Sequence, residues 1–124
     1  MTVAYAGAGM DAFGSDPVDI TPERAAELLA AGATVVDVRE DHERRAGYID
    51  GSEHIELARL AGAAATIDRD GPVVFYCRVG ARSTMAAEAF RSSGYQAYSL
   101  AGGLLGWVAA GLPLAPAGGR VAEH

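Results

Sequence analysis

The sequence predicts an α/β fold of three layers, in which a central, mostly parallel sheet of five strands lies between two layers of helices. Two short runs, 33–38 and 73–76, have the apolar, β-branched composition of buried strands. Because these runs are nearly continuous rather than alternating, they suit neighbouring central positions in a parallel sheet. Segments with helical spacing alternate with the strands, which is typical of right-handed βαβ units with helices on both faces.

Capping residues indicate where the first helix begins and ends. Thr21 suits the N-cap position, Pro22 the first turn, and Glu23 places negative charge near the positive end of the helix dipole. Gly32 is expected to end this helix. The remaining elements follow from apolar spacing and breaker residues: strands at 18–20, 33–38, 52–55, 73–76 and 96–100, and helices at 41–46, 57–65, 83–90 and 103–110.

The chain has the length of one domain. Its 124 residues suffice to bury a hydrophobic core, and we expect the folded part to span 18–112. Residues 1–17 are expected to form a flexible leader and 113–124 a C-terminal tail, because Gly and Pro recur in both without periodicity. No positive charge precedes Arg24 and no apolar segment resembles a signal peptide or membrane anchor, so we expect a cytoplasmic protein.

Composition excludes several classes of function. The formal net charge of −6 disfavours a general role in binding nucleic acid or anionic membranes. A single cysteine excludes an internal disulfide, a Cys-x-x-Cys redox pair and a thiolate-rich zinc site. The three histidines lack the spacing of metal ligands, so no metal is expected.

The only cysteine, Cys77, stands where the strand at 73–76 passes through a short loop into a helix. The first N–H groups of a helix have no internal partner, and the helix dipole adds positive charge there. This environment stabilises a thiolate, so we expect the pKa of Cys77 to fall below about 8.5, the value of a free thiol. Arg78 and Arg82 add positive charge, and Gly80 permits a backbone conformation that other residues resist. Although a lone cysteine is more often a small buried hydrophobe, this order of residues favours a reactive nucleophile.

Asp37 and Arg39 stand at the end of the strand at 33–38. In parallel sheets ligands bind beyond the carboxyl ends of the strands, so these two residues are expected near Cys77. A structural ion pair is the favoured interpretation, and orientation of the catalytic loop or contact with substrate is the alternative.

These segments resemble the single-domain form of the rhodanese family. The likeness lies in Cys-Arg-Val-Gly-Ala-Arg-Ser at 77–83, Val-Val-Asp-Val-Arg-Glu at 35–40, Gly-Tyr-Ile-Asp-Gly-Ser at 47–52, and Leu-Ala-Gly-Gly at 100–103 followed by Trp107. It covers about residues 18–112. One position departs from the pattern, since Tyr48 stands where the family usually has His.

The resemblance implies a rhodanese-like fold and a sulfurtransferase. Cys77 would take the outer sulfur of thiosulfate or a similar small anionic donor as a persulfide, and pass it to cyanide, a thiol or a sulfur-accepting protein. Backbone N–H groups of the loop would stabilise the persulfide sulfur, and the two arginines would hold the donor. The chemistry requires no metal or organic cofactor. The implied substrate-binding residues are Arg78, Val79, Gly80, Ala81, Arg82 and Ser83.

Two other classes of function remain open. A cysteine-dependent phosphatase or arsenate reductase would use the same nucleophile, but its loop has five residues between Cys and Arg, whereas only four separate Cys77 from Arg82. A non-enzymatic binding or sulfur-relay module would share the fold. The retained Cys77 argues against an inactive domain without distinguishing a free enzyme from a relay protein, and the sequence leaves the physiological donor, acceptor and oligomeric state undetermined.

Overall fold

The computed structural model describes residues 16–124 and contains an all-parallel sheet with strand order β2-β6-β5-β3-β4. The strands are β2 (Asp19–Ile20), β3 (Thr34–Asp37), β4 (Glu53–His54), β5 (Val73–Tyr76) and β6 (Ala97–Leu100). The predicted fold class is therefore confirmed, as is the pairing of the two central strands, since Val35 lies opposite Val74. The leader expected at 1–17 lies outside the described residues except for its last two positions.

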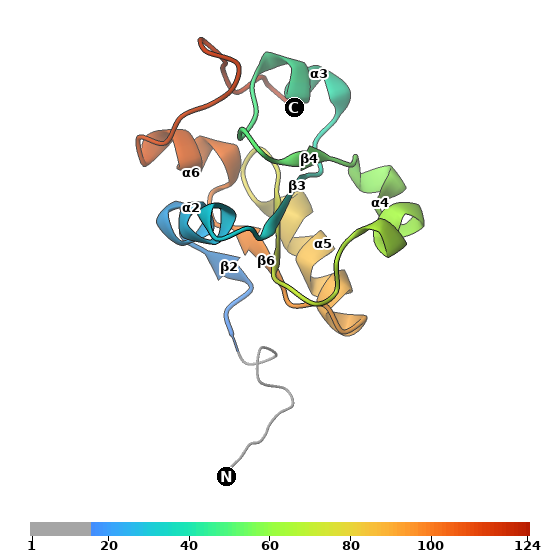
Figure 1. The fold of residues 1–124 in the computed structure, drawn as a ribbon. Helices are drawn as coiled ribbons and strands as arrows, with labels where there is room; N and C mark the ends of the chain where they lie inside the picture. Colours follow the sequence, from blue (N-terminus) through green and yellow to red (C-terminus); the bar gives the residue numbers. More distant parts are fainter. Residues whose placement is uncertain (1–15) are drawn as a thin grey trace.

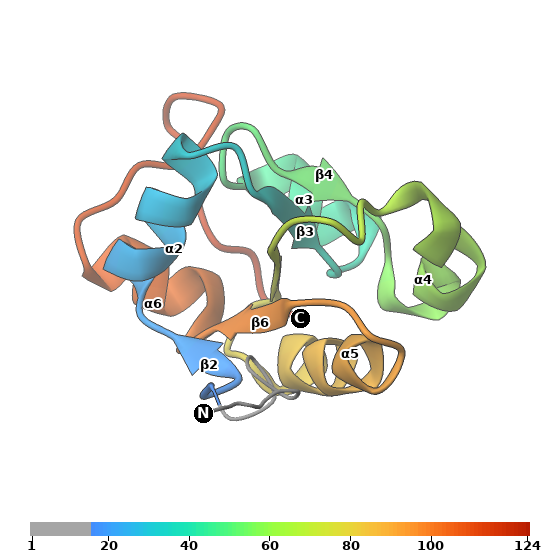
Figure 2. The ribbon, with the colours of Figure 1, turned by 60° about the horizontal axis from the view of Figure 1, so that its bottom comes forward.

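Helices cover both faces of this sheet. They are α2 (Pro22–Ala30), α3 (Asp41–Ala46), α4 (Leu57–Ala63), α5 (Ala81–Ser92) and α6 (Gly103–Ala109), with a 3₁₀ turn at Ala64–Thr66 after α4. Figures 1 and 2 show α2 and α6 on one side of the sheet and α4 and α5 on the other. No helix in the described part of the chain is long and apolar enough to cross a membrane.

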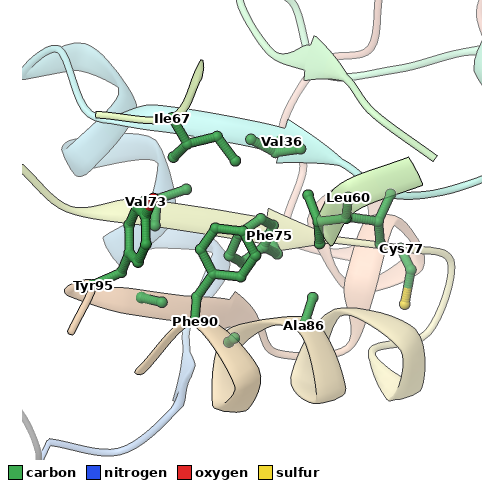
Figure 3. Close-up of a cluster of buried hydrophobic side chains, with 12 residues drawn as sticks. Val36, Leu60, Ile67, Val73, Phe75, Cys77, Ala86, Phe90 and Tyr95 are labelled. Atoms are coloured by element: carbon green, nitrogen blue, oxygen red, sulfur yellow. The ribbon is translucent and has the colours of Figure 1, made fainter. Parts of the chain in front are cut away.

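Alternate residues of the strands divide the core into two apolar clusters. In β5, Phe75 packs with residues of α4 and α5, whereas Val74 and Tyr76 pack with residues of α2 and α6. In the first cluster, shown in Figure 3, the rings of Phe75 and Phe90 lie 4.8 Å apart between centroids. Burying one such ring stabilises the fold by about 1.5–3 kcal/mol. Cys77 belongs to the same cluster, at the carboxyl end of β5.

The helix expected at 83–90 is longer than predicted, because α5 begins at Ala81 and ends at Ser92. Its N-cap is Gly80, whose φ of 118° places it in a left-handed conformation that glycine adopts at little cost. The chain therefore turns directly from the loop into the helix. As a result, the last residues of the predicted anion-binding loop form the first turn of α5.

The segment after α6 packs back onto the domain. Ala115 and Tyr48 form an antiparallel bridge, with N–H to O distances of 2.9 and 2.8 Å. Further along, the N–H of Arg120 donates to the carbonyl of Ala46 at 2.8 Å. A Cβ at Gly47 would lie 2.5 Å from the Arg120 carbonyl oxygen, so only glycine permits this close approach. The last residues of the chain are thereby brought to the end of the molecule that holds Cys77.

Candidate active site

Cys77 follows β5, the strand between β3 and β6, and its sulfur points towards the first turn of α5 (Figure 3). The backbone N–H of Gly80 donates to Cys77 Sγ at 3.1 Å, and Ser83 Oγ lies 3.5 Å from the same sulfur. Cys77 itself has 0% exposed surface, whereas Val79 at the tip of the loop is 52% exposed and Ala81 is also exposed. The sulfur therefore lies beneath a loop whose outer residues face solvent.

The backbone of the loop that begins at Cys77 is held by the start of α6. The N–H groups of Leu104 and Leu105 donate to the carbonyls of Cys77 and Arg78 at 2.8 and 3.1 Å. Gly103 has a φ of 62°, and a Cβ at this position would overlap the carbonyl of Arg78. The second glycine of the Gly-Gly pair therefore allows α6 to approach the loop. In the sequence this pair is part of the family pattern, but the pattern does not indicate its role.

Arg82, in the first turn of α5, is bound to α3. Its two terminal nitrogens donate to the carboxylate oxygens of Glu43 at 2.9 and 3.1 Å. The side chain of Glu43 is fully buried and that of Arg82 is 18% exposed. Burial alone would raise the pKa of Glu43, but the hydrogen bonds from Arg82 and from the N–H of Glu40, with the charge of Arg82, lower it overall. The pair joins the first turn of α5 to α3.

The sequence predicts no functional role for Glu43, although it contains a local signal at this position. Glu43 occupies the third position of α3 and accepts the N–H of Glu40, which completes a capping box. That pattern identifies the residue as a helix cap. Its second role depends on Arg82, which lies 39 residues away in the sequence.

Replacing Glu43 by glutamine is expected to destabilise the protein by about 2–4 kcal/mol at pH 7, because an amide offers one acceptor and directs two N–H donors towards Arg82. Since folding lowers the pKa of Glu43, its contribution to stability is complete above about pH 4.3, the ordinary Glu value, and is lost as the pH falls further. In urea unfolding, the free energies of unfolding of the wild type and of Glu43→Gln should therefore become similar below that pH. Glu27→Gln, which breaks an exposed pair with Arg24, should cost less than about 1 kcal/mol; an equal loss in both variants would contradict the prediction.

Asp37 and Arg39 form a buried ion pair. Arg39 Nε and Nη2 donate to the two oxygens of Asp37, each at 2.8 Å, and neither side chain has exposed surface. Arg39 Nη2 also donates to the carbonyl of Gly47 at 2.7 Å, and Arg44 Nη1 lies 3.4 Å from Asp37. Burial alone would lower the pKa of Arg39, but the hydrogen bonds and charge of Asp37 raise it. These contacts tie the end of β3 to α3 and to the turn at 47–51.

Tyr48, which departs from the family pattern, packs against Arg44, the arginine that lies near Asp37. The guanidinium carbon of Arg44 lies 3.9 Å from the centroid of the Tyr48 ring. Arg44 also donates to the Ser52 hydroxyl and carbonyl at 2.9 and 2.8 Å. The ring of Tyr48 thus holds Arg44 in place across the turn at 47–51. The backbone of Tyr48 holds the segment after α6 through its bridge to Ala115.

Arg78, the other arginine of the loop, contacts the C-terminal segment of the chain. Its Nε donates to the carbonyl of Ala122 at 3.3 Å, and His42 Nε2 lies 3.2 Å from the carbonyl of Glu123. A cleft of about 630 Å³ opens beside Arg82, between α3 and the start of α4. Its lining residues are Val38, Glu40, Asp41, His42, Arg45, Glu56, Leu57, Ala58 and Arg82. The loop is therefore bordered by the C-terminal segment and by a cleft of mixed charge.

Known proteins resemble this chain in sequence and in fold. Residues 21–110 match the family model described as Rhodanese-like domain. Thiosulfate sulfurtransferase GlpE of Pseudomonas aeruginosa (strain LESB58) is 40% identical over 89 residues, which cover 71% of this chain and 81% of that protein. The HTH-type transcriptional regulator Rv0324 of Mycobacterium tuberculosis is 41% identical over 114 residues, covering 86% of this chain and 49% of that protein. The crystal structure of a rhodanese-related protein from Thermoplasma volcanium superposes with a TM-score of 0.73 at 30% identity, covering 77% of this chain and 95% of that chain.

Proposed function

The chain belongs to the rhodanese-like domain family of sulfurtransferases, and we propose that it moves sulfane sulfur from thiosulfate, or a similar small anion, to a thiophilic acceptor through a persulfide on Cys77. The observation that carries this proposal is the N–H of Gly80, 3.1 Å from Cys77 Sγ at the start of α5. A donor in that position stabilises negative charge on sulfur, both in the thiolate and in the persulfide.

The reaction consists of two displacements at sulfur. The Cys77 thiolate attacks the outer sulfur of thiosulfate; a new S–S bond forms, the old one breaks, and sulfite leaves with the bonding electron pair. Cyanide or a thiolate then attacks the terminal sulfur of the persulfide, and Cys77 leaves as the thiolate. No net oxidation or reduction is required, and neither step needs a metal or an organic cofactor. A cytoplasmic location, where reducing conditions keep the thiol free, suits this cycle.

The other residues of the loop bind the donor and hold the first turn of α5 in position. We assign binding of the anionic donor to Arg78 and to the loop from Val79 to Ser83. Arg82 contributes positive charge, but both of its terminal nitrogens are hydrogen-bonded to Glu43. Its main role is therefore to hold the first turn of α5 in place. Within residues 16–124 the side chain of Arg78 makes one hydrogen bond, to the carbonyl of Ala122, and can exchange it for a bond to the donor. Because Cys77 has no exposed surface, part of this cover has to shift when the donor enters.

Mass spectrometry of the protein after incubation with thiosulfate tests the proposal. We expect the wild type to gain the mass of one sulfur atom on Cys77, and cyanide to remove it. The Cys77→Ala variant should gain nothing. Absence of the added sulfur, or an equal gain in the alanine variant, would refute the persulfide. Hydrolysis of an aryl phosphate that is lost in Cys77→Ser would instead support a cysteine-dependent phosphatase.

A second candidate is a relay or regulatory module. It is favoured by the similarity to Rv0324, a protein named as a transcriptional regulator, of which this chain covers about half. Such a module would form the same persulfide but pass its sulfur to a cysteine of a partner protein. Comparing thiosulfate:cyanide turnover with transfer to a partner's cysteine distinguishes the two, because a relay would turn over slowly with small acceptors.

A further inference from the structure

The segment after α6 is anchored to the domain as far as Val121. The side chains of Leu114 and Val121 pack against the apolar cluster on the α2 and α6 side of the sheet. The N–H of Arg120 donates to the carbonyl of Ala46 at 2.8 Å, which adds a backbone hydrogen bond to this apolar contact. Val121 is therefore the last position that the core itself holds.

Beyond Val121 the segment lies between α3 and the loop after β5, where the red end of the ribbon is seen in Figure 1. The carbonyl of Ala122 accepts a hydrogen bond from Arg78 Nε at 3.3 Å, and the carbonyl of Glu123 lies 3.2 Å from His42 Nε2. Among residues 16–124 these are the two hydrogen bonds made by 122–124, and both are longer than the backbone bond of Arg120. Residues 122–124 can therefore separate from the loop while the anchor at Val121 stays in place.

The contact with Ala122 shields Arg78 from solvent. Ala122 is only 8% exposed and Arg78 is half-buried, whereas Val79, the next residue of the loop, is 52% exposed. The carbonyl of Ala122 is a neutral acceptor. An anion that reached the same guanidinium would bind it more strongly, because both partners of that hydrogen bond would be charged. The segment thus gives Arg78 a weaker acceptor in the place where an anionic donor would bind.

We propose that residues 122–124 are an autoinhibitory strap, which holds Arg78 in a closed state and moves away when an anionic donor binds. The strap rests on the proposed function, since it regulates donor binding at the same site. Two hydrogen bonds of modest strength correspond to a closed state that holds about 70–90% of the molecules. Because only the open molecules bind the donor, the strap lowers the apparent affinity for it by about three- to tenfold.

Alkylation of Cys77 by iodoacetate and by iodoacetamide tests the strap without sulfur transfer. The two reagents are similar in size, but only iodoacetate carries a negative charge. Deletion of residues 122–124 should raise the rate with iodoacetate by about three- to tenfold, because Arg78 becomes free to bind its carboxylate. The rate with iodoacetamide should rise by a clearly smaller factor. The ratio of the two rates therefore measures the release of Arg78.

Three further variants separate the strap from other effects of the deletion. Glu123→Gln removes a negative charge that the deletion also removes, but it keeps the backbone contacts, so it should not raise the rate with iodoacetate. His42→Ala keeps the chain complete and removes the contact with the Glu123 carbonyl, so it should raise that rate by part of the full factor. In the Arg78→Ala background the deletion should no longer change the ratio of the two rates.

Several results would overturn the strap. They are an unchanged rate with iodoacetate after the deletion, an equal rise with both reagents, and a rise of the same size in Glu123→Gln. Urea unfolding shows whether the deletion variant is as stable as the wild type. If it is not, His42→Ala decides the question, and an unchanged rate with iodoacetate in that variant would refute the strap.

Thiosulfate, added to the same proteins, keeps the two proposals apart. In the deletion variant kcat/KM for thiosulfate should rise by the same factor while kcat stays unchanged, because the strap competes with the donor. If the deletion accelerates iodoacetate selectively but thiosulfate adds no sulfur to the wild type, the strap stands and the proposed function fails. If low concentrations of thiosulfate add sulfur to both proteins at equal rates, the strap fails and the proposed function stands.

Discussion

Replacing Cys77 by serine is expected to reduce thiosulfate:cyanide turnover by a factor on the order of 10⁴ or more, the scale seen when a covalent nucleophile is removed. A serine hydroxyl is not ionised near neutral pH and cannot carry a transferable sulfur. The substitution should leave the fold intact, because the smaller oxygen can still accept the N–H of Gly80 and interact with Ser83. Steady-state assays and urea unfolding measure the two effects separately.

Cys77→Ala is the matched variant, since it removes the nucleophile without adding a polar atom to the core. Both variants should be inactive although both fold. Turnover within about tenfold of the wild type in either variant would show that another group carries the sulfur. A loss of activity together with a loss of folded protein would be traced to stability by the unfolding measurement.

Replacing Asp37 by asparagine is expected to lower the free energy of unfolding by about 3–5 kcal/mol, the cost of leaving a buried charge without its partner. Arg39 stays charged, because the pKa of an arginine is far above neutral, and its side chain has no exposed surface. Among the described residues the Nη1 atom of Arg39 already lacks a hydrogen-bond partner. No further acceptor nearby can therefore replace the lost carboxylate oxygen. Urea unfolding at pH 7 measures the loss.

Asp41→Asn is the matched control, since Asp41 pairs with Arg45 at 3.0 Å on the exposed face of α3 and should lose less than about 1 kcal/mol. The double variant Asp37→Leu with Arg39→Met should recover part of the stability that Asp37→Asn loses, because it removes both charges together. A loss no larger than that of the control would mean that the buried pair contributes little.

Much of the fold and the core of the candidate site follow from local sequence patterns. The apolar run at 73–76, the Gly80 turn and the helix after it lie in one stretch of chain, so their order alone predicts a nucleophile at a strand-to-helix junction. The start of α5 was placed two residues late, because helical spacing does not reveal that Gly80 takes a left-handed conformation. The arginines were identified, but the sequence does not show that Arg82 is held by Glu43.

The sequence by itself determined the strands, the helices and the position of Cys77, because backbone preferences and apolar spacing act over a few neighbouring residues. Only the tertiary structure decided which side chains meet. Glu43 and Arg82 are 39 residues apart, and Asp19 and Thr84 are 65 apart. Such contacts depend on how β2, β6, α3 and α5 pack, and no local pattern records that packing. The ion pair between Glu43 and Arg82 and the hydrogen bond between Thr84 and Asp19 are products of the assembled fold.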